Sequence, residues 1–189
     1  LHVYDGHLHD PSLVIRKEMC EQIIGRVDHY LSANGNARVV GGGSPTFGIW
    51  ARQTKWECSP GTILCWDCGC GDIYPDLSFE VAAGLVTRVI SKPGENLICL
   101  DLGHKSIGSE MPLERRAIFP ELSEHRLVAQ SEEHLVVEVP DCSQFEVGTA
   151  LTAIPRHICP TVALHAYASV IKDGKPTGEH WRVAARDRF

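Results

Sequence analysis

The segment Ala37-Arg38-Val39-Val40 runs directly into Gly41-Gly42-Gly43-Ser44-Pro45-Thr46, and the rest of the architecture can be read outward from this junction. The first four residues are typical of a short apolar strand, and the glycine run is typical of a loop. Because glycine has no Cβ atom, the backbone amides of such a loop can approach an anion closely. The loop is therefore predicted either to cradle a phosphate group or to serve as a simple turn.

A second strand and a second polar loop precede this junction. Leu1–Tyr4 has the apolar character of a strand, and the loop after it contains His7 and His9. In a βαβ unit, ligand groups collect at the carboxyl ends of the strands. Both polar loops follow a strand, so we expect them at the same edge of one parallel sheet.

A long amphipathic helix is predicted between the two strands. Asp10-Pro11 indicates its start, because aspartate is a favoured N-cap and proline fits the first helical position. Apolar residues then recur at helical spacing, which is typical of a helix with one buried face. Asn34-Gly35 marks its end. Strand, helix and strand in this order predict a βαβ unit.

The second half of the chain has a different pattern of apolar and polar residues. Pro75–Phe79 is typical of a linker, and strand patterns replace the helical period from Glu80 onward. Asp173-Gly174 indicates a hairpin turn, and a short helix is expected within residues 112–118. Along the whole chain, further strands are expected at residues 62–66, 82–91, 96–102, 134–140, 144–147, 150–154, 162–171 and 175–184. The fold class is thus α/β plus an antiparallel β domain or barrel.

The composition excludes several classes of protein. Hydrophobic residues make up 43% of the 189 residues, enough to bury a core, and the net charge of −6 argues against a nucleic-acid-binding surface. No apolar run approaches the roughly 18 residues of a membrane span, and the first residues do not form a secretory signal. We therefore expect a cytoplasmic protein with no nucleic-acid and no membrane partner.

Eight cysteines are many for a chain of this length. Several lie in apolar runs, as small core residues do, and disulfide frameworks usually occur in much shorter secreted chains. We therefore expect reduced thiols. The spacing Cys65-x-x-Cys68-x-Cys70 suggests a zinc ribbon, but it lacks the second pair of ligands that a structural zinc site usually needs.

The best metal-binding candidate is the His-x-Cys pair of His157 and Cys159, which lies between Pro155 and Pro160. If the backbone is extended, residues i and i+2 point to the same side, so one strand could offer both side chains to one ion. An imidazole and a thiolate suit zinc better than magnesium or calcium. The alternative is a buried cysteine beside a hydrogen-bonded histidine.

Five motifs, in their order along the chain, resemble a known family. They are Tyr4-Asp5-Gly6-His7, Gly41-Gly42-Gly43-Ser44-Pro45-Thr46, Asp101-Leu102-Gly103-His104-Lys105, Ser131-Glu132-Glu133-His134 and Pro155-Arg156-His157-Ile158-Cys159-Pro160-Thr161. Together they resemble the C-terminal half of the D-threonine aldolase and D-serine dehydratase family, enzymes with the alanine-racemase-like (type III) fold that use pyridoxal 5′-phosphate. The resemblance covers essentially the whole chain, and its most specific part is the His-x-Cys pair.

The resemblance implies a (β/α)8 barrel that holds the cofactor, followed by a β domain that holds a divalent metal. Residues 1–76 would be the C-terminal part of the barrel, and residues 77–189 would be the metal-binding β domain. The chain begins in mid-strand without methionine, as expected for part of a longer protein. None of Lys17, Lys55 and Lys105 has the position of the family's Schiff-base lysine. A missing N-terminal barrel segment is therefore an expected partner, and the isolated fragment is expected to be inactive.

Three groups of residues receive roles from the resemblance. The cofactor phosphate would be bound by Gly42, Gly43, Ser44 and Thr46. The metal, zinc or else manganese, would be bound by His157 and Cys159. The catalytic candidates are Tyr4, which would line the cofactor pocket, and His7 or His9, either of which would act as a base.

The implied activity is that of a lyase acting on a small D-amino acid with a β-hydroxyl group, in a homodimer. The His-x-Cys pair leans toward dehydratase and zinc, whereas His-x-Asp would have leaned toward aldolase and manganese, and both reactions stay open. A non-catalytic metal-binding β module and an amino-acid racemase of the same fold are the alternatives. Glu133 and His134 are weaker candidates to orient His157 beside the metal.

Overall fold

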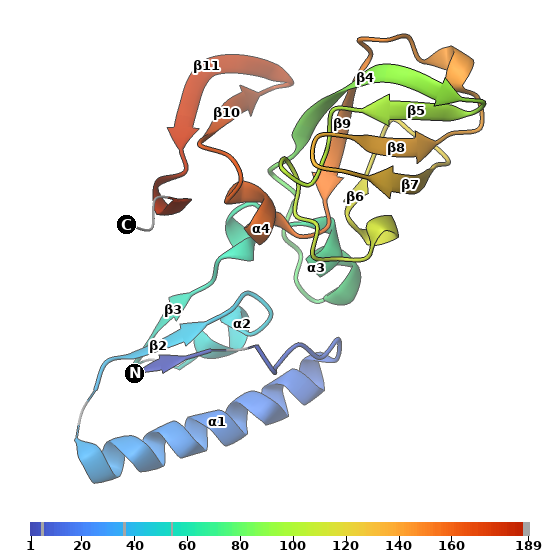
Figure 1. Ribbon diagram of the computed structural model, residues 1–189. Helices are drawn as coiled ribbons and strands as arrows, with labels where there is room; N and C mark the ends of the chain where they lie inside the picture. Colours follow the sequence, from blue (N-terminus) through green and yellow to red (C-terminus); the bar gives the residue numbers. More distant parts are fainter. Residues whose placement is uncertain (5, 36, 54, 187–189) are drawn as a thin grey trace. The chain divides into compact units, whose positions relative to one another are not determined.

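The computed structural model describes residues 1–4, 6–35, 37–53 and 55–186, and Figure 1 shows their path. The chain divides into two compact units between Ala82 and Ala83, shortly after the boundary predicted between residues 76 and 77. Each unit has its own cluster of buried hydrophobic residues. The two units are therefore described separately.

The first unit is a small parallel sheet with helices. Among the described residues its strands are β1 (His2–Val3), β2 (Val39–Gly42) and β3 (Trp56–Ser59), in the order β1-β2-β3. Helix α1 (Leu13–Asn34) connects β1 to β2, which confirms the predicted βαβ unit. The other helical segments are α2 (Phe47–Trp50), η1 (Thr62–Leu64) and α3 (Cys68–Ile73). Because the strands are parallel, the loops after β1 and β2 leave the sheet at the same edge.

Helix α1 begins later than predicted. Ser12, not Asp10, is the N-cap, because its hydroxyl accepts a hydrogen bond from the Ile15 N–H at 3.5 Å. The Asp10 carboxylate instead accepts from the Ser12 N–H at 2.8 Å, which closes a turn ahead of the helix. The end is as predicted, since Gly35 follows the last helical residue with a φ of +81°.

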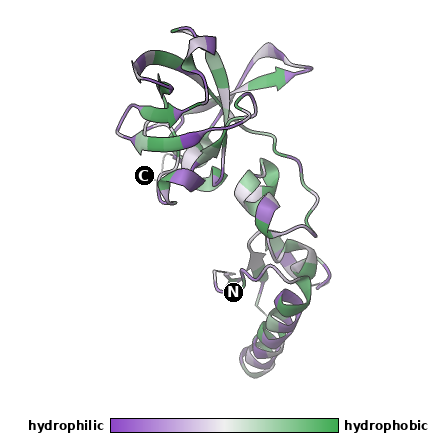
Figure 2. Cartoon of the chain, turned by 90° about the vertical axis from the view of Figure 1, so that its right-hand side faces the viewer, coloured by the Kyte–Doolittle hydropathy of each residue, from purple (hydrophilic) through white to green (hydrophobic). Residues whose placement is uncertain are grey.

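Helix α1 has one buried face. Cys20 and Val27 are buried in a cluster with Val3 and Val39 of the sheet. Along α1 the colours in Figure 2 alternate between hydrophilic and hydrophobic, as expected for such a helix. No helix in the described part of the chain is both long and apolar enough to cross a membrane.

Trp50 lies at the centre of the first unit's core. Its side chain is fully buried and stacks on Trp56, with 5.2 Å between the ring centres. A Cβ atom at position 41 would lie 2.8 Å from the Trp50 ring, so this packing requires Gly41. The core also contains Val3, Leu8, Cys20, Val27, Val39 and Ile49.

The strand expected at residues 62–66 is absent, and that prediction is wrong. Thr62–Leu64 forms η1, and Trp66 has a φ of +49°, which a strand does not allow. Trp66 is nevertheless buried. Leu64, in contrast, is 79% exposed, so the apolar character of this run marks neither a strand nor a continuous buried segment. The third strand of the sheet, β3, comes earlier.

The second unit is built on an antiparallel sheet. Within the described residues the strand order is β6-β9-β4-β5-β8-β7, and each neighbouring pair is antiparallel. The strands are β4 (Leu85–Gly94), β5 (Leu97–Leu100), β6 (Ala117–Ile118), β7 (Arg126–Gln130), β8 (Leu135–Glu138) and β9 (Ala150–Pro155). Ile98, Leu100 and Val137 lie fully buried in the core. The predicted antiparallel β domain is confirmed.

Several local predictions in the second unit are wrong. The strand expected at residues 144–147 is absent, and η3 (Cys142–Gln144) overlaps its start. The helix expected within residues 112–118 is limited to η2 (Leu113–Arg115). Strand β7 lies in a segment without a strand prediction. The strand expected from residue 162 begins only at β10 (Tyr167–Lys172), because α4 (Ile158–Val162) comes first.

The predicted hairpin near the C-terminus is confirmed. β10 pairs with β11 (Lys175–Arg182) around Asp173 and Gly174, whose φ angles of +51° and +71° are typical of a type I′ turn. The short segment η4 (Ala184–Arg186) follows the hairpin.

Two loops of the second unit are in direct backbone contact. In the loop after β5, the His104 N–H donates to Ser131 O at 2.9 Å and the Lys105 N–H donates to Glu132 O at 3.0 Å. A Cβ atom on Gly103 would lie 2.0 Å from the Glu132 carbonyl oxygen. Only glycine therefore allows the two loops to approach this closely.

Asp101 ties the end of β5 to β4. Its carboxylate accepts hydrogen bonds from the hydroxyl of the buried Thr87 and from the Arg88 N–H, both at 2.6 Å. Burial raises the pKa of Asp101, but these hydrogen bonds together outweigh it, and the net effect is a lowered pKa.

Replacing Asp101 by asparagine is expected to lower the second unit's free energy of unfolding by about 1–2 kcal/mol near neutral pH. Because folding lowers the Asp101 pKa, the wild-type contribution is present above the unfolded pKa of about 4. It is lost as the pH falls through the lower folded pKa. Urea unfolding followed by circular dichroism, from about pH 7 to about pH 3, checks this, and the asparagine variant should show a shallower acid-side decline. Parallel pH profiles would contradict the assignment.

Candidate functional site

The glycine-rich loop lies between β2 and α2, at the carboxyl edge of the parallel sheet. Gly43 has a φ of +93°, in the region that favours glycine, and it turns the chain at the end of β2. His2 lies beside the loop, because its Nε2 atom would be 3.2 Å from a Cβ at position 42. No sequence motif marks His2, although strand alternation places it on the face opposite the buried Val3.

The first peptide group of the loop has a fixed direction. The Gly42 carbonyl accepts hydrogen bonds from Trp50 Nε1 at 3.0 Å and from Thr46 Oγ1 at 3.2 Å. In a trans peptide the C=O and the following N–H point in opposite directions, and the described chain has no cis peptide bond. The Gly43 N–H is therefore directed away from Trp50 and Thr46.

The second peptide group of the loop is held in the same way. The Pro45 carbonyl accepts a hydrogen bond from Arg16 Nε at 3.1 Å. The Thr46 N–H, on the other side of that peptide plane, is directed away from Arg16. Buried donors thus hold the carbonyl groups of Gly42 and Pro45, and the N–H group that follows each carbonyl points away from the donors of that carbonyl. Backbone N–H groups with fixed directions are what an anion-binding loop uses.

The two hydroxyl side chains of the loop are buried, but they are not equivalent. Ser44 Oγ accepts a hydrogen bond from the Ile63 N–H at 3.3 Å, which uses a lone pair and not the hydroxyl proton. Thr46 Oγ1 donates its proton to the Gly42 carbonyl. In this arrangement Ser44 and the backbone amides are the donors suited to a phosphate group, whereas the Thr46 hydroxyl shapes the loop.

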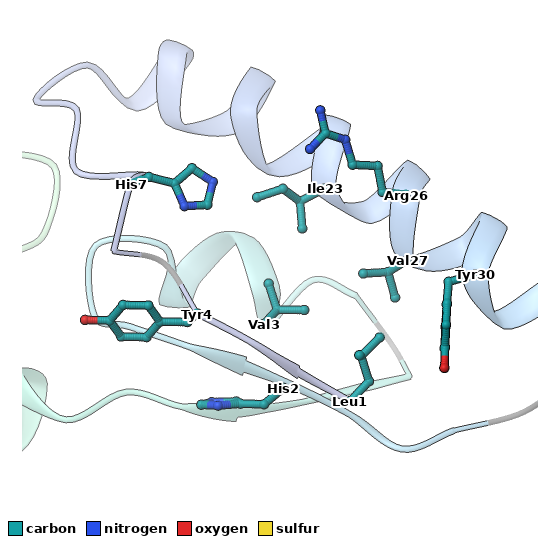
Figure 3. Close-up of a pocket in the computed structure, with 9 residues that line it drawn as sticks. All are labelled: Leu1, His2, Val3, Tyr4, His7, Ile23, Arg26, Val27 and Tyr30. Atoms are coloured by element: carbon teal, nitrogen blue, oxygen red, sulfur yellow. The ribbon is translucent and has the colours of Figure 1, made fainter.

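Tyr4 and His7 line an open hollow of about 350 Å³ beside β1, which Figure 3 shows. Helix α1 supplies Ile23 and Arg26 to the same hollow. Tyr4 is 72% exposed, and its ring lies so close to Gly6 that a Cβ there would be 2.4 Å from Tyr4 Cε1. The structure therefore brings Tyr4 and His7 together.

His9 has different surroundings from His7. Its ring packs edge-on against Tyr74, with 6.4 Å between the ring centres. The Arg16 guanidinium lies over the same Tyr74 ring, 4.9 Å from its centre. The two histidines that sequence analysis could not separate are thus distinct, because His7 borders an open hollow and His9 borders a charged cluster.

The His-x-Cys pair lies between β9 and α4, and the condition of an extended backbone holds for His157 but not for Cys159. His157 is extended (φ −142°, ψ 104°) and caps the helix, but Cys159 belongs to the helix itself. Pro160 permits this conformation, since proline is tolerated in the first turn of a helix. The two side chains still meet, because the His157 ring forms a hydrogen bond with the Cys159 side chain.

A carboxylate that sequence analysis did not identify holds the His157 ring. Glu110 Oε1 lies 2.5 Å from His157 Nδ1. The hydrogen bond with Cys159 raises the pKa of His157, burial opposes this, and Glu110 adds to the rise, so that the pKa reaches about 9. Thr161 fixes the backbone, donating to the His157 carbonyl at 2.9 Å and accepting from the Gly108 N–H at 3.0 Å.

Two donor side chains are available for a metal ion at this place. Within the described ranges, no set of three or more His, Cys, Asp and Glu side chains is arranged to hold a metal. The imidazole of His157 and the thiol of Cys159 are donor types that zinc takes, and a ligand histidine usually contacts a carboxylate through its other ring nitrogen. Glu110 has the position of that carboxylate, so the residues fit a metal whose remaining ligands come from water or substrate.

Glu133 is not the carboxylate that contacts His157. It pairs with Lys105 at 2.8 Å, and Glu132 pairs with the same ammonium group at 2.9 Å. The hydrogen bond with Lys105 lowers the pKa of Glu133. All three side chains are exposed, so this network adds little to stability. The expectation that Glu133 orients His157 is therefore wrong, and Glu110 has that position.

The chain is similar in sequence to several known proteins. A family model described as a putative serine dehydratase domain matches residues 82–171. An uncharacterised protein of Mycobacterium tuberculosis is 37% identical over 117 residues, which are 60% of this chain and 86% of that protein. A D-threonine aldolase of Arthrobacter sp. is 29% identical over 180 residues, covering 90% of this chain and 46% of the aldolase.

A solved structure extends the comparison to the fold. D-threonine aldolase from Filomicrobium marinum has a TM-score of 0.82 at 23% identity, covering 98% of this chain and 52% of that one. The chain spans about half the length of the two aldolases that it matches. The chain therefore belongs to the D-threonine aldolase and D-serine dehydratase family, with the last β/α units of an alanine-racemase-like barrel followed by an antiparallel β domain.

Proposed function

We propose that the full-length protein is a lyase that uses pyridoxal 5′-phosphate and a divalent metal, and acts on a small D-amino acid with a β-hydroxyl group. The observation that carries this proposal is the direction of the glycine-rich loop, whose carbonyl groups at Gly42 and Pro45 are held by Trp50, Thr46 and Arg16. Such a loop at the carboxyl edge of a parallel sheet suits a phosphate group. The relatives named D-threonine aldolase and serine dehydratase domain support the reaction class.

The first unit would bind the cofactor. The backbone amides of Gly43 and Thr46, together with the Ser44 hydroxyl, would hold its phosphate group. Tyr4 would line the cofactor pocket, and His2 lies close enough to Gly42 to contribute to the same surface. When bound, pyridoxal phosphate supplies an electron sink for the bond that breaks next to the substrate's Cα.

The second unit would bind the metal. His157 and Cys159 would be its protein ligands, and zinc is the ion that their chemistry favours over manganese. When bound, the ion supplies a Lewis acid for the substrate hydroxyl. Glu110 would keep the His157 ring in the orientation that a ligand needs, through the contact at Nδ1.

The two reactions of the family place different demands on His7 and His9. In a dehydratase the hydroxyl group leaves the substrate as water. In an aldolase a base must take the proton from that hydroxyl, and either histidine could hold it. The ring of His9 is fixed against Tyr74, whereas His7 borders the open hollow. Replacing each by alanine in turn therefore separates the two candidates.

The barrel requires a partner segment. Strand β1 lies at an edge of the described parallel sheet, where a further parallel strand can pair. We propose that an N-terminal barrel segment with the lysine that binds the cofactor occupies this edge, that the chain alone is inactive, and that the complete enzyme is a homodimer. The eight cysteines form no disulfide bond, which suits a reducing compartment such as the cytoplasm.

A product assay on the full-length protein tests the proposed function. The protein is supplied with pyridoxal phosphate and either zinc or manganese, and D-serine and D-threonine are offered separately. A dehydratase converts D-serine to pyruvate and ammonia, and D-threonine to 2-oxobutyrate and ammonia. An aldolase cleaves D-threonine to glycine and acetaldehyde. A full-length protein that stays colourless with the cofactor and yields none of these products would overturn the proposal in favour of a non-catalytic metal-binding module.

Replacing Glu110 by alanine is expected to weaken zinc binding about 10- to 100-fold, the usual effect of losing the carboxylate behind a histidine ligand. The reason is that Glu110 fixes the ring of His157 through Nδ1. Competition with a chromogenic zinc chelator measures the affinity. Glu114→Ala removes a nearby exposed carboxylate and serves as the matched control. Equal affinities for the two variants would contradict the role of Glu110.

A further inference from the structure

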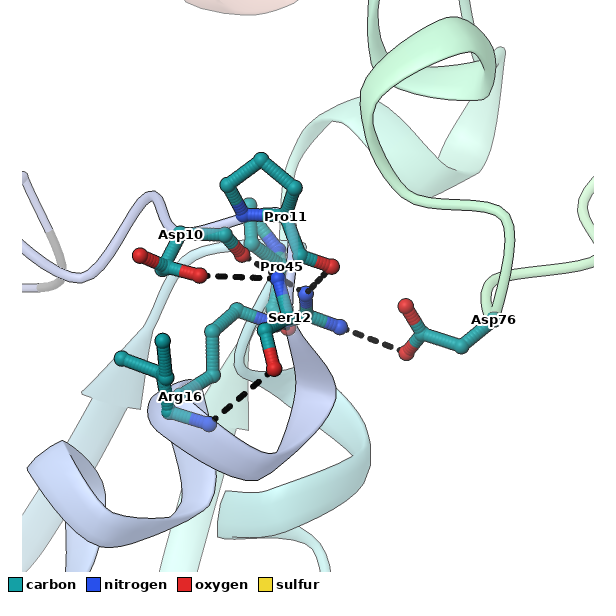
Figure 4. A network of polar contacts seen from close by, with 7 residues as sticks. Asp10, Pro11, Ser12, Arg16, Pro45 and Asp76 are labelled. Carbon is teal, nitrogen blue, oxygen red and sulfur yellow. Dashed lines mark hydrogen bonds and ion pairs between the residues drawn. The ribbon is translucent and has the colours of Figure 1, made fainter.

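Arg16 is fully buried in the first turns of α1, although it carries a charge. Figure 4 shows the cluster around it. Its Nη1 donates to the carbonyl groups of Asp10 at 2.8 Å and Pro11 at 3.0 Å, and its Nε donates to that of Pro45 at 3.1 Å. Its Nη2 pairs with the Asp76 carboxylate at 2.5 Å. The three nitrogens of this guanidinium therefore all have protein partners.

These contacts connect three separate parts of the first unit. Asp10 and Pro11 end the histidine loop that follows β1, Pro45 belongs to the glycine-rich loop that follows β2, and Asp76 comes after α3. A guanidinium group is planar and its N–H directions are fixed, so contacts on several sides define the relative positions of their acceptors. One side chain thus sets how the two carboxyl-edge loops lie with respect to each other.

The contact with Pro45 has a specific consequence for the loop. Because proline has no N–H, the peptide group between Ser44 and Pro45 has no hydrogen-bond donor. The next amide is that of Thr46, and its direction is fixed by the carbonyl of the same peptide plane. Because Arg16 holds that carbonyl, Arg16 determines which way the Thr46 N–H points.

We propose that Arg16 is the positioning residue of the anion-binding loop, and that it sets the affinity for the cofactor's phosphate without touching it. This inference rests on the proposed function, because it takes the loop to be a phosphate site. It also explains a buried charge in a core where an apolar residue would fill the same space. The ion pair with Asp76 compensates the charge. The effect on the loop therefore comes from the planar guanidinium group, whose N–H groups point in fixed directions.

Arg16→Lys in the full-length protein tests this. The variant keeps the positive charge but loses the planar guanidinium group. A loss of affinity for phosphate would therefore result from the changed geometry and not from a changed charge. Inorganic phosphate is the probe, because it needs no covalent lysine. Amide chemical shifts of Gly43 and Thr46 in ¹H–¹⁵N spectra are followed through the titration. The matched control is Val39→Ala, which removes buried volume from the same core at the opposite end of β2.

In the wild type, the Gly43 and Thr46 amides are expected to shift and saturate. Arg16→Lys should move the Thr46 amide in the absence of phosphate and weaken binding by about tenfold or more, the factor that corresponds to one good hydrogen bond. Val39→Ala should bind phosphate within about twofold of wild type, even though its melting temperature falls. Normal phosphate binding by Arg16→Lys would overturn the inference and leave the phosphate site standing. No response of the wild-type loop would overturn the phosphate site and the inference together.

Discussion

Replacing Arg16 by methionine is expected to lower the free energy of unfolding of the first unit by roughly 3–5 kcal/mol. Methionine fills much of the same volume but carries no donor. The carbonyl groups of Asp10, Pro11 and Pro45 then lose their partner, and Asp76 keeps a charge without its cation. An unsatisfied buried acceptor costs about 1–3 kcal/mol, which applies in full to Pro45. The carbonyl groups of Asp10 and Pro11 and the Asp76 carboxylate are only partly buried, so each adds less, and together the four groups account for the range.

Urea unfolding followed by tryptophan fluorescence measures this loss, because three of the four tryptophans, Trp50, Trp56 and Trp66, lie in the first unit, whereas Trp181 of the second unit is 62% exposed. Lys17→Met is the matched control, since it makes the same kind of change at the neighbouring cation of α1, which forms no hydrogen bond with the described residues of the two loops. We expect it to change the free energy of unfolding by less than about 1 kcal/mol. A loss below that value for the methionine variant would mean that the carbonyl groups find other partners and that Arg16 does not hold the loops.

Replacing Gly103 by alanine is expected to lower the free energy of unfolding of the second unit by about 3 kcal/mol or more, the upper end of the cost of overpacking. The added Cβ would lie 2.0 Å from the carbonyl oxygen of Glu132 and 2.3 Å from the nitrogen of Glu133. Both are backbone atoms, so no side chain can rotate to make room. The two loops must separate, and the backbone hydrogen bonds of His104 and Lys105 are lost with them.

Gly84→Ala is the matched control for this variant. A Cβ there would meet its nearest neighbours, Thr152 Cγ2 and Ala153 O, at 3.4 and 3.5 Å, which is ordinary contact. We expect a change within about 0.5 kcal/mol. Urea unfolding followed by circular dichroism compares the two variants. If alanine costs the same at both positions, the loops of the second unit are not held as closely as described.

The features predicted from sequence are those with a local physical signal. The βαβ unit follows from the helical period between two apolar segments, and the hairpin follows from Asp173 and Gly174, whose side-chain chemistry matches a type I′ turn. The glycine-rich loop was identified because three consecutive glycines directly after an apolar strand are typical of a loop, whether or not it binds a phosphate. Each of these rests on neighbouring residues, which a sequence displays directly.

The start of α1 shows where local signals stop. Asp10 and Ser12 are both good N-caps, and sequence gives no reason to prefer the second. Arg16 decides between them, because it binds the carbonyl groups of Asp10 and Pro11 and so keeps both residues outside the helix. The choice is made by tertiary contacts that reach as far as Asp76.

The candidate metal site shows the same limit. The spacing of His157 and Cys159 identified the donor pair. It did not predict the backbone conformation of the pair, because Pro160 fits the first turn of a helix as well as an extended segment. Glu110 was missed altogether, since it lies 47 residues from His157 and nothing near it marks a site. Similarly, the apolar run ending at Trp66 is equally typical of a strand and of an irregular segment that buries Trp66 alone.

The contact between Gly41 and Trp50 links two positions in evolution. Any larger residue at position 41 would collide with the indole, and a smaller residue at position 50 would remove the donor that holds the Gly42 carbonyl. A substitution at position 41 alone would produce a steric clash, and a substitution at position 50 alone would leave the glycine-rich loop without this hydrogen bond. Substitutions that vary one should therefore appear only with compensating changes at the other, and engineered libraries of this barrel should randomise the two codons as a pair.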